Sequence, residues 1–190
     1  MLAGWAAAAL PALAESMRPV EGRVIAAYLN SIDFAKPQVK VLVVASRTAT
    51  TKEAFVSSKP DAQQLAVDLP QATMAVIADF LRVAELSADV EIPPDLVRAE
   101  LEWRVAPERS LDRIFNEGRL SDAWSRFYKE YPRASGITRI SRVGIDEQSN
   151  QALLYFSATP GGLGGAGFFV LLHRRFGIWH VLASKLAWIS

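Results

Sequence analysis

The residues between Gly162 and Gly167 are the first place where this sequence could do chemistry. Their order, Gly-Leu-Gly-Gly-Ala-Gly, matches the G-x-G-x-x-G pattern of nucleotide-binding loops. A dinucleotide site needs a helix after that loop, but the apolar run 168–172 follows, which is typical of a strand. We therefore interpret the loop as a hairpin connection whose glycines supply positive φ angles or let an aromatic ring approach the backbone. The alternative is that its backbone N–H groups bind an anion or another ligand. The candidate residues are Gly162, Gly164, Gly165 and Gly167.

The two histidines, His173 and His180, lie in predicted strands on either side of one turn. Two ligands do not complete a zinc site, no carboxylate stands close to either in the sequence, and the chain has no cysteine. We expect both side chains to face solvent, with a role as general base or metal ligand as the alternative. The sequence accordingly predicts no metal site and no cofactor.

Four aromatic residues lie at i, i+3, i+4 and i+7 of a predicted helix over 122–131. Aromatic residues at this spacing are typical of a core-facing stripe, and the alternative is that they line a ligand pocket. No serine lies in a G-x-S-x-G sequence, and we identify no catalytic residue. The stripe consists of Trp124, Phe127, Tyr128 and Tyr131.

The elements that must position these residues are clearest in the last third of the chain. Apolar runs of strand length, separated by Gly, Asn and Asp, predict an antiparallel meander over 137–190. The run 151–158 is apolar on both alternating faces, which indicates a central strand buried on both sides. The four predicted strands are Ile137–Ile145, Gln151–Thr159, Phe168–Arg174 and Ile178–Trp188.

The first two thirds of the chain supply helices and two further strands. Helical patterns cover 19–31, 71–86, 111–117 and 122–131, and strand patterns cover 38–46 and 101–105. Helices followed by a run of antiparallel strands predict an α+β fold, with helices 71–86 and 111–131 covering one face of the sheet. A curved sheet of the cystatin-like or nuclear-transport-factor-like kind is a topological analogy for this arrangement.

Composition and the first residues bear on location and partners. The chain has 190 residues and a net charge of +1, with no Lys/Arg-rich block, so the charge pattern of a nucleic-acid binder is missing. Residues 1–14 carry no charge, are too short to span a bilayer, and end in Ala-Leu-Ala before Glu15. We interpret 1–14 as a signal peptide without a basic n-region, and 15–190 as one exported α+β domain with no membrane anchor. The alternative is a buried Ala-rich helix.

Several short motifs stand in one fixed order and together resemble an uncharacterised family of bacterial, often exported proteins. The resemblance covers about the last 70 residues well. In that family the glycine loop commonly reads Cys-Gly-Gly-Leu-Cys-Gly-x-Gly, whereas Pro160 and Gly164 stand at the two cysteine positions here. The motifs are Trp124-x-x-Phe127-x-x-x-Tyr131-Pro132, Ser141-x-Val143-Gly144, Ala152-Leu153-Leu154-Tyr155, Gly161-Gly162-Leu163-x-Gly165-x-Gly167 and Trp188-Ile189-Ser190. The resemblance implies no established activity.

Two functions follow as hypotheses. The first is a periplasmic or secreted binding or interaction module without catalysis, whose small-molecule or protein partner the sequence does not identify. The second is a small hydrolase or lyase-like enzyme that uses His173 or His180 beside the glycine loop. A pocket lined by both a histidine and a carboxylate would favour the enzyme, and an aromatic pocket would favour binding.

Overall fold

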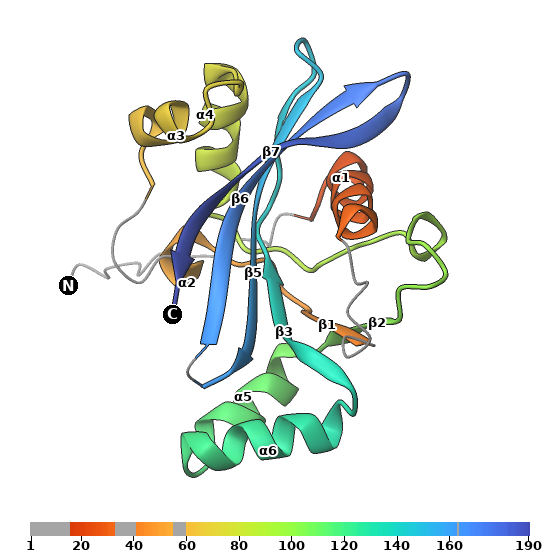
Figure 1. Cartoon of the computed structure of the whole chain (residues 1–190), viewed down its shortest axis with the longest axis vertical. Helices are drawn as coiled ribbons and strands as arrows, with labels where there is room; N and C mark the ends of the chain where they lie inside the picture. Colours follow the sequence, from red (N-terminus) through yellow and green to blue (C-terminus); the bar gives the residue numbers. More distant parts are fainter. Residues whose placement is uncertain (1–15, 33–40, 55–59, 163) are drawn as a thin grey trace, which may run out of the picture.

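A computed structural model describes residues 16–32, 41–54, 60–162 and 164–190 (Figure 1). The predicted signal peptide, residues 1–14, lies outside this range. The helices are α1 (Pro19–Ser31), α2 (Thr51–Ala54), α3 (Ala62–Asp68), α4 (Met74–Val83), the 3₁₀ helix η1 (Pro94–Leu96), α5 (Glu108–Asn116) and α6 (Leu120–Glu130). The strands are β1 (Val41–Ala45), β2 (Trp103–Ala106), β3 (Ala134–Ile140), β4 (Gly144–Asp146), β5 (Gln151–Gly161), β6 (Gly164–Arg175) and β7 (Ile178–Ile189).

The strands form one mixed sheet in the order β2-β1-β3-β5-β6-β7, with the short β4 also paired to β5. β1 runs parallel to β2 and β3, and the pairs from β3 to β7 are antiparallel. The structure confirms the α+β class and the C-terminal antiparallel run. It adds a parallel part at the β1 side, which the sequence did not predict.

Helices cover both faces of the sheet. α4, α5 and α6 lie on one face, as predicted, where they pack on the side chains of β1 and β5 that point that way (Figure 1). α1 covers the opposite face through a core that includes Ile25, Leu29, Val44 and Leu154. The run 152–156 is buried on both faces, so the prediction of a central strand is confirmed for β5.

Two predicted elements divide into parts. The expected strand 137–145 is divided into β3, which ends at Ile140, and β4, which begins at Gly144, where the chain lies against α4. A Cβ at Gly144 would stand 2.4 Å from the backbone nitrogen of Phe80. The expected helix 71–86 is shorter than predicted, since α4 starts after Thr73, whose side chain accepts a hydrogen bond from the Val76 N–H at 3.2 Å.

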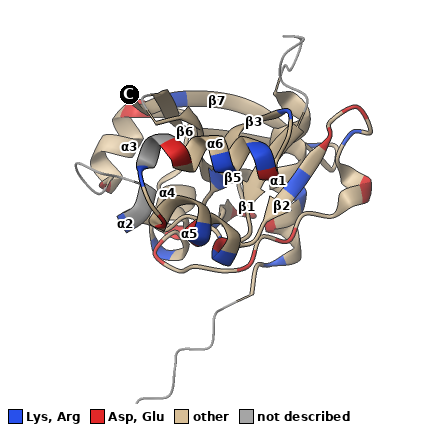
Figure 2. Ribbon diagram, turned by 90° about the horizontal axis from the view of Figure 1, so that it is seen from below, with Lys and Arg blue, Asp and Glu red and all other residues tan. Residues whose placement is uncertain are grey.

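Charged residues are spread over the surface. Blue and red segments alternate on the side shown in Figure 2, without an extended area of one sign. Within the described residues, no helix is both long enough and apolar enough to cross a membrane.

Candidate functional site

The glycine-rich segment forms the end of the β5–β6 hairpin rather than a long loop. β5 continues to Gly161 and β6 begins at Gly164, so the predicted connection over 160–167 is wrong in its bounds. None of the described glycines of this segment has a positive φ, so the prediction of positive φ angles is wrong there. The glycines of this segment adopt extended backbone, and the β5–β6 pairing reaches Gly161 and Gly164 with a register shift after Ala158.

Close approach of an aromatic ring explains two of the glycines. Trp188 lies across the hairpin, and a Cβ at Gly167 would stand 2.3 Å from its Nε1 atom. A Cβ at Gly165 would stand 3.0 Å from the same indole ring. The indole N–H donates a 2.6 Å hydrogen bond to the hydroxyl of Tyr155, and burial raises the pKa of that hydroxyl. Gly165 and Gly167 therefore make room for Trp188.

The stripe on α6 lies beside the same hairpin end. Phe127 is fully buried in the core between α5, α6 and β1, and Tyr131 is also buried there. Trp124 is half-buried, and its Nε1 would lie 3.4 Å from a Cβ at Gly162. Tyr128 donates a hydrogen bond to the carbonyl of Pro160. The structure thus brings the glycine segment and the aromatic stripe together, and most contacts between them are packing contacts. A shallow pocket of about 340 Å³ borders them and includes Phe115 and Trp124.

The two histidines lie at the other end of the sheet. His173 and His180 are cross-strand partners on β6 and β7, and the Nε–H of Arg175 donates to the Nδ1 atom of His173 at 3.3 Å. Among the described residues there is no cluster of three potential metal-ligating side chains. At roughly 3.4 Å per residue of strand, Gly164 and His173 are on the order of 30 Å apart along β6. The structure does not bring a histidine beside the glycine segment.

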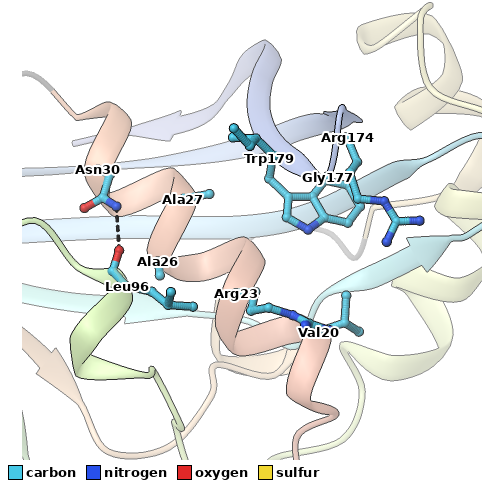
Figure 3. Close-up of a pocket in the computed structure, with 10 residues that line it drawn as sticks. Val20, Arg23, Ala26, Ala27, Asn30, Leu96, Arg174, Gly177 and Trp179 are labelled. Atoms are coloured by element: carbon cyan, nitrogen blue, oxygen red, sulfur yellow. Dashed lines mark hydrogen bonds between the residues drawn. The ribbon is translucent and has the colours of Figure 1, made fainter.

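A pocket of about 380 Å³ lies between α1 and the β6–β7 hairpin (Figure 3). One face of α1 forms a wall, with Val20, Arg23, Ala27 and Asn30 spaced three and four residues apart. This stripe is about 15 Å long at 1.5 Å per residue. Between Arg23 and Asn30 this stripe carries only small side chains. The remaining lining residues are Ala26, Leu96, Arg174, Gly177, Ile178 and Trp179.

The two ends of this α1 pocket differ in charge. At one end both polar atoms of the Asn30 amide are hydrogen-bonded, because its nitrogen donates to the carbonyl of Leu96 at 2.7 Å and its oxygen accepts from the Arg98 N–H at 2.8 Å. At the other end Arg23 and Arg174 extend toward the same side in Figure 3. Within the described part of the chain Arg23 has no ion-pair partner. That end of the pocket can therefore take an anion.

Arg174 is held in place by three neighbours. Its guanidinium binds the side chains of Asn150, at 2.8 Å, and Glu147, at 2.9 Å, and lies 5.3 Å from the centre of the Trp179 ring. This geometry fixes the indole as an apolar wall of the pocket. Because Glu147 already neutralises Arg174, Arg23 is the stronger candidate for contact with an anion.

A buried ion pair fixes α1 under the sheet and so positions the α1 pocket. Glu21 and Arg142 are both buried, and the guanidinium donates to the carboxylate at 2.7 and 2.9 Å. The Val143 N–H adds a third hydrogen bond at 2.9 Å. Arg18 bridges Glu21 to Asp79 of α4, with contacts of 3.0 and 3.2 Å.

The charges in this network are compensated. Burial alone would raise the pKa of Glu21, but the hydrogen bonds from Arg142, Val143 and Arg18 outweigh it and hold the pKa below its usual value. The pKa of Asp79 is lowered in the same way, since the Ile145 N–H and two arginines outweigh burial. Both carboxylates stay ionised at neutral pH, which suits a structural role and not proton transfer.

A third pocket, of about 540 Å³, is polar and lies where β1 and β3 end. Its carboxylates are Glu108 and Asp112, one turn apart on α5. Arg139 binds both oxygens of Glu108, at 3.2 and 3.4 Å, so this carboxylate already has a partner inside the pocket. We therefore rank this pocket below the α1 pocket.

The side chains that line the α1 pocket offer contacts for binding and no group for acid–base catalysis. Arginine does not lose its proton in proteins, and none of the other lining side chains titrates near neutral pH. The pocket contains neither a histidine nor a carboxylate. Sequence analysis missed it because its walls come from residues 20–30 and 174–179. The available signal was the pair of alanines at 26 and 27 between polar positions of one helix face.

Comparisons with known proteins assign the chain to no family. No family model, no curated protein and no solved structure matches it.

Proposed function

We propose that the protein is a non-catalytic binding module and that its ligand is a small amphipathic molecule with one anionic group. The observation that carries this proposal is the α1 pocket, with apolar walls, Arg23 at one end and no group that could transfer a proton. A ligand of this class would lay its apolar part along Ala27 and Trp179 and its anion against Arg23. The volume of about 380 Å³ suits a molecule of moderate size.

The geometry does not favour the enzyme alternative. That hypothesis needs His173 or His180 near the glycine segment, and the two hairpin ends lie at opposite ends of the molecule (Figure 1). No other arrangement of the candidate residues supports a reaction.

A direct test uses the fluorescent amphipathic anion anilinonaphthalene sulfonate. We expect one saturable site, competition by a medium-chain carboxylate such as decanoate, and at least tenfold weaker binding in Ala27→Leu, which fills the groove. Ala66→Leu is the matched control, since Ala66 is also a half-buried helical alanine but lies on α3. Equal binding by wild type and Ala27→Leu would refute the proposal.

We also propose that the protein is exported to the periplasm or the cell exterior. The uncharged apolar start, the Ala-Leu-Ala sequence before Glu15 and the resemblance to bacterial exported proteins support this. N-terminal sequencing of protein from its host should return Glu15 as the first residue. Recovery of Met1 or Leu2 from a cytoplasmic fraction would refute export.

A further inference from the structure

The turn between β6 and β7 contains an aromatic residue in an unfavourable backbone conformation. Arg175 pairs with Ile178, so the loop has two residues, Phe176 and Gly177, with φ values of 50° and 80°. Positive φ at both loop residues is the geometry of a type I′ turn, for which Asn-Gly is the preferred sequence. A bulky residue with positive φ is strained. Asparagine in place of Phe176 would therefore make this turn more stable.

The side chain of Phe176 is not buried, so packing does not offset this backbone strain. It is 102% exposed, and the neighbouring Ile178 is 61% exposed. Among the described residues no ring packs against Phe176. In Figure 1 the β6–β7 hairpin projects beyond α1 at the upper right, so the turn is a protruding point of the molecule. Natural sequences break local rules mainly where a function requires it.

Both charged residues next to the turn are arginines, and Glu147 pairs with one of them, Arg174, at 2.9 Å. Arg174 and Arg175 precede it, and Arg175 has no carboxylate partner within the described ranges. Arg23 of the α1 pocket also has none. Residues 148–190 contain no aspartate or glutamate. The turn is thus an apolar tip bordered by guanidinium groups.

We propose that this hairpin tip docks on an anionic lipid surface. Phe176 and Ile178 enter the boundary between headgroups and acyl chains, and Arg175 binds lipid phosphates. Aromatic residues are enriched at this depth of a membrane, and basic groups near the surface add attraction to anionic lipid. Lipids can rearrange around a convex tip of two apolar side chains. A protein partner would instead need a pocket that matches the tip. The contact is peripheral and reversible, as for other weak interfacial anchors.

The test is sedimentation with vesicles of phosphatidylglycerol and phosphatidylcholine in equal parts, at about 1 mM lipid. We expect wild type to pellet with these vesicles and at least tenfold less with pure phosphatidylcholine. Phe176→Asn should lower the partition constant about tenfold, which corresponds to about 1.4 kcal/mol. The same variant should melt at a higher temperature, because Asn-Gly suits the turn. Lost binding in a more stable protein separates docking from folding.

Two further variants complete the test. Arg175→Gln should weaken binding to the anionic vesicles and reduce its dependence on salt. Val67→Gln is the matched control: Val67 is 74% exposed on α3, and its loss should leave binding unchanged. Wild type that stays in the supernatant with anionic vesicles overturns the proposal. So does Phe176→Asn that pellets as well as wild type.

Discussion

Alanine substitution at three glycines of the β5–β6 hairpin should separate close packing from ligand binding. The three positions differ in the space left for a Cβ. At Gly167 that atom would stand 2.3 Å from the Nε1 atom of Trp188 and 2.6 Å from the hydroxyl of Tyr155. At Gly165 it would stand 3.0 Å from the Trp188 ring, and at Gly164 its nearest neighbour is Cγ of Pro160 at 3.9 Å.

These distances predict a graded loss of stability. Gly167→Ala forces the buried ring of Tyr155 and the half-buried ring of Trp188 apart. Overpacking of roughly 1–3 kcal/mol and a lost hydrogen bond of about 1 kcal/mol then combine to about 2–4 kcal/mol. Gly165→Ala requires the indole to move by a few tenths of an ångström, at about 1 kcal/mol. Gly164→Ala meets open space at a φ that alanine adopts freely, and we expect stabilisation by about 0.4–1 kcal/mol.

Urea melts of the three variants and wild type measure these values. Trp188 fluorescence should change most in Gly167→Ala, because the new methyl group displaces its ring. Gly167→Ala that is as stable as wild type would refute the packing argument. Three variants of equal stability that all lose binding of an anion would favour the alternative, a ligand site at the glycines.

Three further predictions concern the core. Arg142→Met should lower the free energy of unfolding by about 3 kcal/mol, because it leaves the carboxylate of Glu21 buried without its main partner; a loss under about 1 kcal/mol in urea melts would contradict this. Since the folded-state pKa values of Glu21 and Asp79 lie below 4.5 and 3.8, their contribution to stability is complete above those values and is lost as the pH falls through the folded-state pKa values. Thermal melts from about pH 7 to pH 2 should therefore show a steep loss below about pH 4, and a flat midpoint would exclude this role. Phe127→Ala should cost about 3–5 kcal/mol, and Trp124→Ala less, because only the first side chain is fully buried; equal losses in urea melts would count against this difference.

Local sequence patterns were sufficient to predict whether most elements are helices or strands. The run 151–158, which is apolar on both alternating faces, predicted a strand buried on both faces, and β5 is that strand. The spacing of Trp124, Phe127 and Tyr131 predicted a helix with an aromatic side, and the side of α6 that carries Phe127 packs in the core. Such patterns succeed because the period of a helix or strand decides which side chains share a face.

Element boundaries depended on contacts that the local pattern does not contain. The run 137–145 is apolar enough for one strand, yet it is interrupted by residues 141–143. The cause is Glu21, whose carboxylate binds Arg142 and the Val143 N–H across a separation of 121 and 122 residues. An acidic residue in the first turn of a helix looks like an ordinary exposed charge until its partner is known.

The tertiary structure alone decided the position of the α1 pocket and of the exposed β6–β7 turn. Asn30, Arg23 and Trp179 are unremarkable in sequence, and they form one pocket because α1 lies against the β6–β7 hairpin. The sequence by itself determined that residues 175–177 are a turn and that no acidic residue follows Glu147. The structure decided that the turn protrudes and that Phe176 is fully exposed, because burial depends on all the elements packed around a residue and a turn pattern depends only on its neighbours.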